Sequence, residues 1–211
     1  MDAIAGAAKD SQESLTQVER RSRAERRILA AALAIIAEKG LSGLTLAAAG
    51  ERAGYSRGIA GHHFGRKDQL LSTLVQRVTS RVQSDLMEVA RREPGLPTLT
   101  ATLERYFSLA SKDQTNMRAM HRLMIEGNNQ PAIAEAIRDA NRRGVRAFAY
   151  HLRAAIQAGE VRDDIDPKAQ AAVILGGMRG TTGLWLANPG YLSLTALKET
   201  FINTLLLGIR A

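Results

Sequence analysis

Residues 45–63 read TLAAAGERAGYSRGIAGHH, and this stretch decides the fold. Thr45 is a residue type that caps helix starts, so it predicts a short helix over residues 46–53. Gly54 allows a sharp turn, after which Ser56 is expected to cap a second short helix that runs to the end of the stretch. Two short helices joined by a glycine-containing turn are typical of a helix-turn-helix.

Helical patterns flank this stretch on both sides. Before it, apolar residues recur every three or four positions up to Lys39, and Gly40 is expected to end that helix. After it, a long amphipathic helix is expected over residues 67–92, followed by the clearest break in the chain, PGLP at 94–97. No run alternates with a period of two for long enough to indicate a strand. Beyond the break, five further helices are predicted, over residues 98–111, 113–126, 131–158, 166–187 and 193–209.

The sequence therefore predicts an all-α protein, and its composition agrees. Only 4% of the 211 residues are aromatic, and alanine, the strongest helix former, is abundant. The chain has no cysteine, which excludes a disulfide framework, a cysteine-ligated metal centre and a thiol nucleophile. The predicted division is a flexible N-terminal arm (1–20), a helix-turn-helix domain (21–67), a linking helix with its connector (68–97) and a second helical domain (98–211).

Positive charge is concentrated around the helix-turn-helix. The net charge of the chain is +8, and residues 20–67 alone carry ten Lys and Arg against three Asp and Glu, a net charge of +7. Residues 1–19 carry −3 and residues 68–211 carry +4. A clustered basic excess favours a polyanionic partner such as duplex DNA, although a solvated helix face would explain the charge alone.

Neither an enzyme nor a membrane protein is indicated. The glycine-rich residues 176–183 lack the Lys-Ser/Thr ending of a phosphate-binding loop and lie inside a predicted helix. Residues 169–187 are nearly uncharged, but Arg179 at their centre favours a buried helix of a globular protein over a membrane span. Because no secretory signal fits the first 30 residues, we expect a cytoplasmic protein, and nothing indicates a cofactor.

Ordered matches extend the helix-turn-helix pattern over residues 26–74. The matching segments are ILAAA (28–32), AEKG (37–40), LTL (44–46), ERAGYSRG (51–58), HHFGRK (62–67) and LL (70–71). Together they resemble the N-terminal domain of the tetracycline-repressor (TetR) family of bacterial transcription regulators. The second half is similar more loosely, through GEVR (159–162), DP (166–167), MRG (178–180), Trp185 and NP (188–189), to the last two helices of that family.

The resemblance implies DNA contacts at eight positions. Thr45 matches a capping threonine that also touches a phosphate, and Lys67 matches the lysine that opens the fourth helix and contacts phosphate. The recognition helix is matched at its start by Ser56, Arg57, Gly58 and Ile59 and at its end by His62 and His63. Two positions depart from the family, with Ala47 in place of a frequent Arg and Gly61 in place of a phosphate-binding Tyr.

Side-chain chemistry narrows some of these roles. Arg57 has a donor fork suited to O6 and N7 of guanine, and base or phosphate contact remains open. Arg57, Arg66 and a basic arm with Arg20, Arg21 and Arg23 are expected to compensate for the two departures. His62 and His63 are not expected to bind a metal, because adjacent helix positions point about 100° apart.

The family resemblance also implies a homodimer, and a repressor that a small ligand releases from an operator in duplex DNA. The last two helices would form the dimer, through Trp185, Leu194, Leu197, Phe201 and Leu205. Ligand would favour a dimer whose recognition helices no longer match successive major grooves, with the long helix from Lys67 transmitting the change. The alternatives are a helical protein-interaction module without a DNA role and a small helical enzyme.

Methionine and aromatic residues are candidates for the lining of a ligand pocket in the second domain. They are Met117, Met120 and Met124 on one helical stripe, with His121 beside them, and Phe107 and Phe148, together with Tyr106, Tyr150 and His151, on neighbouring predicted helices. Each would serve equally well as ordinary core, because Met fills irregular gaps. We expect the ligand, an inducer, to be apolar or amphipathic, with His121 or a Tyr orienting its polar end.

Overall fold

The computed structural model describes residues 16–211, and over this part of the chain the protein consists of nine α-helices and one 3-10 turn. They are α1 (Gln17–Lys39), α2 (Leu46–Arg52), α3 (Ile59–Phe64), α4 (Lys67–Ala90), α5 (Leu96–Lys112), α6 (Gln114–Glu126), η1 (Gly127–Asn129), α7 (Pro131–Gln157), α8 (Pro167–Ala187) and α9 (Leu194–Ile209). These residues contain no β-strand, only an isolated bridge between Val161 and Arg210. The predicted all-α fold is confirmed.

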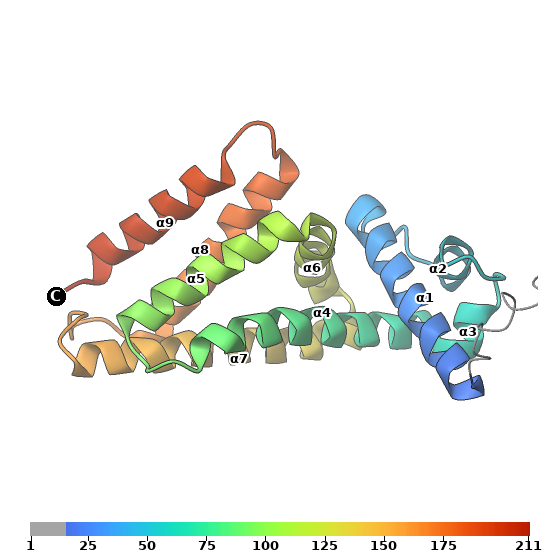
Figure 1. Ribbon diagram of the computed structural model, residues 1–211, viewed down its shortest axis with the longest axis horizontal. Helices are drawn as coiled ribbons and strands as arrows, with labels where there is room; N and C mark the ends of the chain where they lie inside the picture. Colours follow the sequence, from blue (N-terminus) through green and yellow to red (C-terminus); the bar gives the residue numbers. More distant parts are fainter. Residues whose placement is uncertain (1–15) are drawn as a thin grey trace, which may run out of the picture.

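The helices form two regions that share α4 (Figure 1). Helices α1, α2 and α3 pack together at one end of the molecule, and the start of α4 adjoins them. Helix α4 then continues along α5 and α7, while α6 packs against α1. Helix α8 packs on α7, and α9 packs on α5 and α8, so that the C-terminus lies far from α1–α3.

The first helix begins earlier than the sequence predicted. The Thr16 side chain accepts a hydrogen bond from the Glu19 amide at 3.2 Å, and the Glu19 carboxylate accepts one from the Thr16 amide at 2.7 Å. This reciprocal capping box fixes the helix start. Residues 17–20 are therefore helical rather than part of a flexible arm, and residues 1–15 of that predicted arm lie outside the described residues.

Only one of the two predicted caps of the helix-turn-helix forms. The Thr45 hydroxyl caps α2 by accepting from the Ala48 amide at 3.0 Å. Ser56 does not cap α3, because a turn intervenes and the helix begins only at Ile59. The backbone carbonyl of Ser56, rather than its hydroxyl, accepts from the Ile59 amide at 3.2 Å. Gly58 precedes the helix without a side-chain cap.

Helices α2 and α3 approach each other closely at Gly50. A Cβ atom at this position would lie 2.8 Å from the Ser56 carbonyl oxygen and 3.3 Å from Cγ2 of Ile59. At the end of α3, Phe64 is buried in the core that also holds Ile28 of α1. The absence of a side chain at Gly50 therefore sets the distance between the two helices, and Phe64 fixes α3 to the rest of the domain.

Helix boundaries in the second region lie within two residues of the predicted ones. The predicted first residues of three of these helices are their N-terminal caps: Asp113 for α6, Asp166 for α8 and Ser193 for α9. Each of these side chains accepts a hydrogen bond from a backbone amide in the first turn. Helix α5 begins at Leu96, inside the predicted break, because Pro97 is tolerated in the first turn of a helix.

Helix α8 contains the nearly uncharged stretch 169–187. Its buried residues recur at three- and four-residue spacing, and Arg179 at its centre donates to Oδ1 of Asn141 on α7 at 2.5 Å. None of the helices within residues 16–211 combines the length and the hydropathy that crossing a membrane would require.

The two regions are tied together at the loop between α1 and α2, which we call the Leu41 junction. The Leu41 amide donates to Oε2 of Glu126 at 2.7 Å, and the Leu41 carbonyl oxygen accepts from Nζ of Lys67 at 3.1 Å. Glu126 is the last residue of α6 and Lys67 the first of α4. Arg122 of α6 also donates to the Ile36 carbonyl oxygen of α1 at 3.4 Å. The position of α1 therefore depends on α6.

Candidate nucleic-acid interface and ligand cavity

The predicted DNA-contacting residues fall into two groups. Five are exposed on the helix-turn-helix: Thr45, Ser56, Arg57, Gly58 and His62. The other three, Ile59, His63 and Lys67, are partly buried. A Cβ atom at Gly58 or Gly61 would meet nothing within 4 Å, so this side of α3 is open to a partner.

The three partly buried residues also have contacts within the domain. Ile59 lies against Gly50 of α2. The ring of His63 lies between those of His62 and Phe64, with centroid distances of 6.0 Å and 6.3 Å. Lys67 donates one hydrogen bond at the Leu41 junction, and its ammonium has two further donors that a phosphate could use.

The arginines of the basic domain are not equivalent. Arg52 forms a two-pronged ion pair with Glu38 at 2.5 Å, and the guanidinium of Arg27 lies 5.1 Å from the centroid of the Tyr55 ring. These two arginines hold the domain together. The basic cluster Arg20, Arg21 and Arg23 is exposed on the first turns of α1, which contacts α3, instead of lying in an arm.

Arg57 is held by a carboxylate of the same domain. Its Nε lies 2.5 Å from Oε1 of Glu51 on α2, and the Arg57 side chain is 78% exposed. A phosphate or a guanine must compete with Glu51 for this guanidinium. The ion pair restrains Arg57 near α3 but weakens its attraction to DNA.

We expect the substitution Glu51→Gln to tighten operator binding by about two- to fivefold, because exposed ion pairs are weak and the change frees Arg57. Fluorescence anisotropy with labelled duplex measures the dissociation constant. Glu25→Gln is the matched control, since it removes the same charge from the basic domain without touching Arg57. Equal gains in affinity in both variants would mean that net charge alone controls operator binding. No gain in affinity for Glu51→Gln would mean that Arg57 does not contact DNA.

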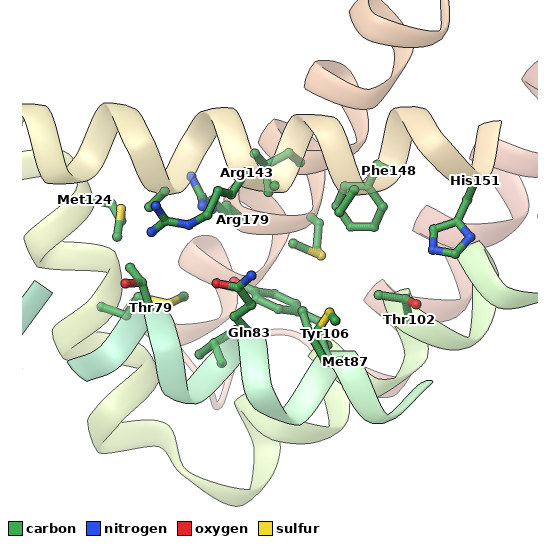
Figure 2. A pocket seen from close by; sticks show the side chains of 18 residues that line it. Thr79, Gln83, Met87, Thr102, Tyr106, Met124, Arg143, Phe148, His151 and Arg179 are labelled. Atoms are coloured by element: carbon green, nitrogen blue, oxygen red, sulfur yellow. The ribbon is translucent and has the colours of Figure 1, made fainter. Parts of the chain in front are cut away.

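The second region contains a cavity of about 130 Å³ enclosed by α4, α5, α6, α7 and α8. Met120, Met124 and Phe148, three of the predicted ligand residues, line it. Its other lining residues include Thr79, Gln83, Met87, Thr102, Tyr106, Arg143, His151 and Arg179 (Figure 2). The mouth lies between α4 and α7, where Gln83, Met87 and Arg143 are exposed.

The remaining three predicted ligand residues lie elsewhere. The Phe107 ring packs on Phe201 of α9, with centroids 6.0 Å apart, and is 1% exposed. Met117 faces a smaller hollow between α4, α5 and α6. His121 borders an outer groove between α6 and α8. The Met stripe is divided along the helix axis: Met117 lies in the first turn of α6, whereas Met120 and Met124 follow about one and two turns later.

The two arginines of the cavity were missed from the sequence. Arg143 and Arg179 were not predicted as ligand residues, because only position in the fold separates them from surface charges. Tyr106 and His151, which were named as candidates, do line the cavity. Nδ1 of His151 is buried and has no hydrogen-bond partner among the described residues. Burial also lowers the pKa of His151.

Tyr106 and His121 form a buried polar pair beside the cavity. The Tyr106 hydroxyl lies 3.3 Å from Nε2 of His121. Burial raises the pKa of Tyr106 above its ordinary value. Burial, together with the charge of Arg179, lowers the pKa of His121 to about 4. Both side chains are therefore neutral near pH 7.

This pair should make stability depend on pH. Because the unfolded chain binds a proton at His121 near pH 6.5 and the folded chain only near pH 4, stability is lost as the pH falls between these values. Between pH 7 and pH 5 the loss is about 2 kcal/mol. Denaturant titrations should show a clearly larger loss in the wild type than in His121→Asn, in which the lowered pKa of His151 still contributes. His62→Asn, at an exposed site, is the control; equal slopes in all three proteins would contradict the assignment.

Three large apolar side chains are exposed on α8 and α9. Val173, Leu184 and Leu207 are 65%, 68% and 86% exposed. Gly176, Gly180 and Gly208 lie on the same helices, and a Cβ atom at any of them would meet nothing within 4 Å. We call these six residues the outer face.

The residues predicted to form the dimer are also packed within their own chain. Trp185 is 7% exposed, and Leu194, Leu197, Phe201 and Leu205 are partly buried against the core of their own chain. Phe201 lies against Phe107 and against Gly177 of α8. The four residues of α9 thus attach that helix to the core of its own chain, and a role in a dimer stays a prediction.

A helix-turn-helix with an open, basic side, joined through a shared helix to a second helical domain with an internal cavity, defines a DNA-binding transcriptional regulator of the two-domain all-α class. The comparisons with known proteins identify the family. Residues 28–74 match the family of bacterial regulatory proteins described as tetR, and residues 95–207 match the C-terminal domain of BetI-type transcriptional repressors. The chain belongs to the TetR family, as the sequence predicted.

Individual relatives agree with this assignment. The chain is 24% identical over 186 residues to the fatty acid metabolism regulator protein of Bacillus subtilis (strain 168), covering 86% of this chain and 93% of the relative. The triclosan complex of SmeT from Stenotrophomonas maltophilia has a TM-score of 0.74 and 25% identity, covering 89% of this chain and 92% of that chain. FadR from Bacillus subtilis with stearoyl-CoA has a TM-score of 0.74 and 20% identity, covering 88% and 99%.

Proposed function

We propose that the protein is a homodimeric, cytoplasmic repressor that leaves its operator when an apolar or amphipathic ligand occupies the cavity of the second region. The observation that carries this proposal is the double role of α6. Met120 and Met124 of α6 line the cavity, and Glu126, at the end of the same helix, holds the Leu41 amide of the DNA-binding domain.

A ligand that moves α6 therefore acts on the DNA-binding domain directly. A shift of Met120 or Met124 displaces Glu126, because all three lie on one rigid helix. Displacing Glu126 moves the loop between α1 and α2, and with it α2 and α3. Helix α4 offers a second route, since it lines the cavity through Val82 and Leu86 and holds Leu41 through Lys67. Ligand would thus favour a dimer with misplaced recognition helices.

The outer face supports a symmetric dimer. Large exposed apolar residues on two adjacent terminal helices favour a partner, and glycines between them allow close helix approach. Two copies joined by α8 and α9 would present two recognition helices to successive major grooves. The SmeT complex with triclosan supports an apolar ligand for the second region.

The experiment selects binding sites from random duplex DNA and then tests release. We expect an inverted repeat, as a symmetric dimer requires. A panel of alkyl and aryl compounds of different charge is then scored for release by anisotropy. Selection of no common sequence would reject a specific regulator. If the protein binds one sequence specifically but no compound alters that binding, the proposed DNA-binding function is kept and the proposed release by a ligand is rejected.

The Leu41 junction can be tested without knowing the ligand. We expect Glu126→Ala to lower the free energy of unfolding by about 1–3 kcal/mol, because the partly buried Leu41 amide loses its acceptor. Hydrogen exchange of the Leu41 amide should also accelerate in this variant. Glu104→Ala, at an exposed position of α5, is the matched control. Unchanged stability and unchanged exchange at Leu41 would remove the junction from the proposed coupling.

A further inference from the structure

The cavity carries two cationic side chains and no acidic one. Arg143 of α7 and Arg179 of α8 line it, and none of its lining residues is Asp or Glu. Among residues 16–211 neither arginine takes part in an ion pair. The acceptor for Arg179 is the neutral side-chain oxygen of Asn141. Arg179 is partly buried, and since buried charges in proteins are normally paired, its positive charge is uncompensated; Arg143 adds an exposed positive charge at the mouth of the same cavity.

Both arginines line the cavity where α8 packs on α7. Arg143 shares its side of α7 with Ala140, Gly144 and Ala147, which also line the cavity. Figure 2 shows Arg143 and Arg179 toward one end of the cavity and Phe148 and His151 toward the other. The positive charge is therefore localised at one end.

Much of the remaining lining of the cavity is apolar, and it includes Val82, Leu86, Met120, Phe148, Leu175 and Met178. Methionine side chains adapt to hydrocarbon of varied shape. Burial lowers the pKa of Arg179, which agrees with a partly desolvated charge that lacks a counter-charge.

On the basis of the function proposed above, we propose that the effector is an amphipathic anion whose acid group binds between Arg143 and Arg179 and whose hydrocarbon part lies along the apolar walls. The planar guanidinium fork matches the oxygens of a carboxylate or of a phosphate or sulfate ester. A neutral compound of the same shape would leave both charges uncompensated. A cation would be repelled by them.

Isothermal titration calorimetry on the full chain, without DNA, tests the head group. The probes are octanoate, octyl sulfate, octan-1-ol and octyltrimethylammonium, which share one hydrocarbon chain. We expect both anions to bind at least about tenfold more tightly than the alcohol, and the cation not to bind. The ratio of octanoate to octyl sulfate affinity identifies which acid group the site prefers. Equal affinity for octanoate and octan-1-ol, a preference for the cation, or no binding of either anion would overturn the proposal.

Substitutions locate the site. Arg179→Met and Arg143→Met should each weaken octanoate about 10- to 100-fold and leave octan-1-ol unchanged. Arg153→Met is the control, because Arg153 is exposed on α7, away from the cavity, and the change removes the same charge. Circular dichroism checks that each variant is folded. If Arg179→Met unfolds, the test rests on Arg143→Met, because Arg143 is exposed and its replacement should not disturb the fold. Wild-type affinity in the folded arginine variants would overturn the proposal.

Operator release measured in parallel separates this inference from the proposed function. If octanoate binds through both arginines but never releases DNA, the anion site stands and the proposed repressor mechanism fails. If another compound releases DNA and neither anion binds, the mechanism stands and the anion site is rejected.

Discussion

Replacing Leu184 and Leu207 together by Glu should convert the dimer to a monomer and lower operator affinity by at least about 100-fold. Both side chains are exposed on the outer face, at 68% and 86%, so two charges there would be buried unpaired in a dimer. A monomer binds each half-site alone and loses the gain in affinity that comes from linking two sites. Sedimentation velocity and anisotropy measure the two effects.

Tyr150→Glu is the control for this prediction. Tyr150 is 57% exposed on α7, so its replacement introduces the same charge outside α8 and α9. This variant should remain dimeric and bind its operator as the wild type does. An intact dimer in the Leu184 and Leu207 double variant would mean that the interface lies elsewhere.

Gly50→Ala should destabilise the DNA-binding domain by about 1–3 kcal/mol and reduce operator affinity by at least about tenfold. The new methyl group would lie 2.8 Å from the Ser56 carbonyl oxygen, so α2 and α3 must move apart. Each misplaced base contact costs about 1–3 kcal/mol of recognition. Thermal unfolding and anisotropy measure the two losses.

Gly61→Ala is the matched control for stability. A Cβ atom there would meet nothing within 4 Å, and alanine favours the helix, so stability should rise by about 0.5–1 kcal/mol. If both alanine variants have the same stability, the close approach at Gly50 does not constrain the two helices.

Local signals predicted most of the fold. Apolar spacing, together with cap and turn residues, identified each α-helix of residues 16–211, and Thr45 was correctly predicted as a cap because its contact with Ala48 is local. The reciprocal bond between Thr16 and Glu19 is equally local and was a signal that could have been used. Ser56 was wrongly predicted as a cap because serine is common both at helix starts and in turns. In the structure a turn at Arg57 and Gly58 separates Ser56 from the start of α3 at Ile59.

The lining of the cavity could not be predicted in full, because it depends on contacts between helices that are far apart in the sequence. Helical spacing placed Met117, Met120 and Met124 together, but packing assigns the first of them to a different hollow. Arg143 and Arg179 are 36 positions apart and meet only because α7 packs on α8. Their lack of a carboxylate partner is a property of the folded chain, and sequence spacing could not reveal it.

The outer face shows the same limit. Leu194, Leu197, Phe201 and Leu205 follow helical spacing, but spacing does not state which side of an apolar helix faces its own chain. The structure uses these residues internally and leaves Leu207 exposed. Terminal helices that are apolar on two sides therefore predict a partner without identifying the contact residues.

The most direct test of the central claim is the salt dependence of binding to the selected duplex and to a scrambled duplex of the same composition. The protein should prefer the selected duplex at every salt concentration. The logarithm of its affinity should fall linearly with the logarithm of salt, by about a thousandfold between about 50 mM and about 200 mM if about six phosphates are neutralised. Equal, salt-insensitive binding to both duplexes, or no binding to either, would contradict the assignment as a sequence-specific regulator.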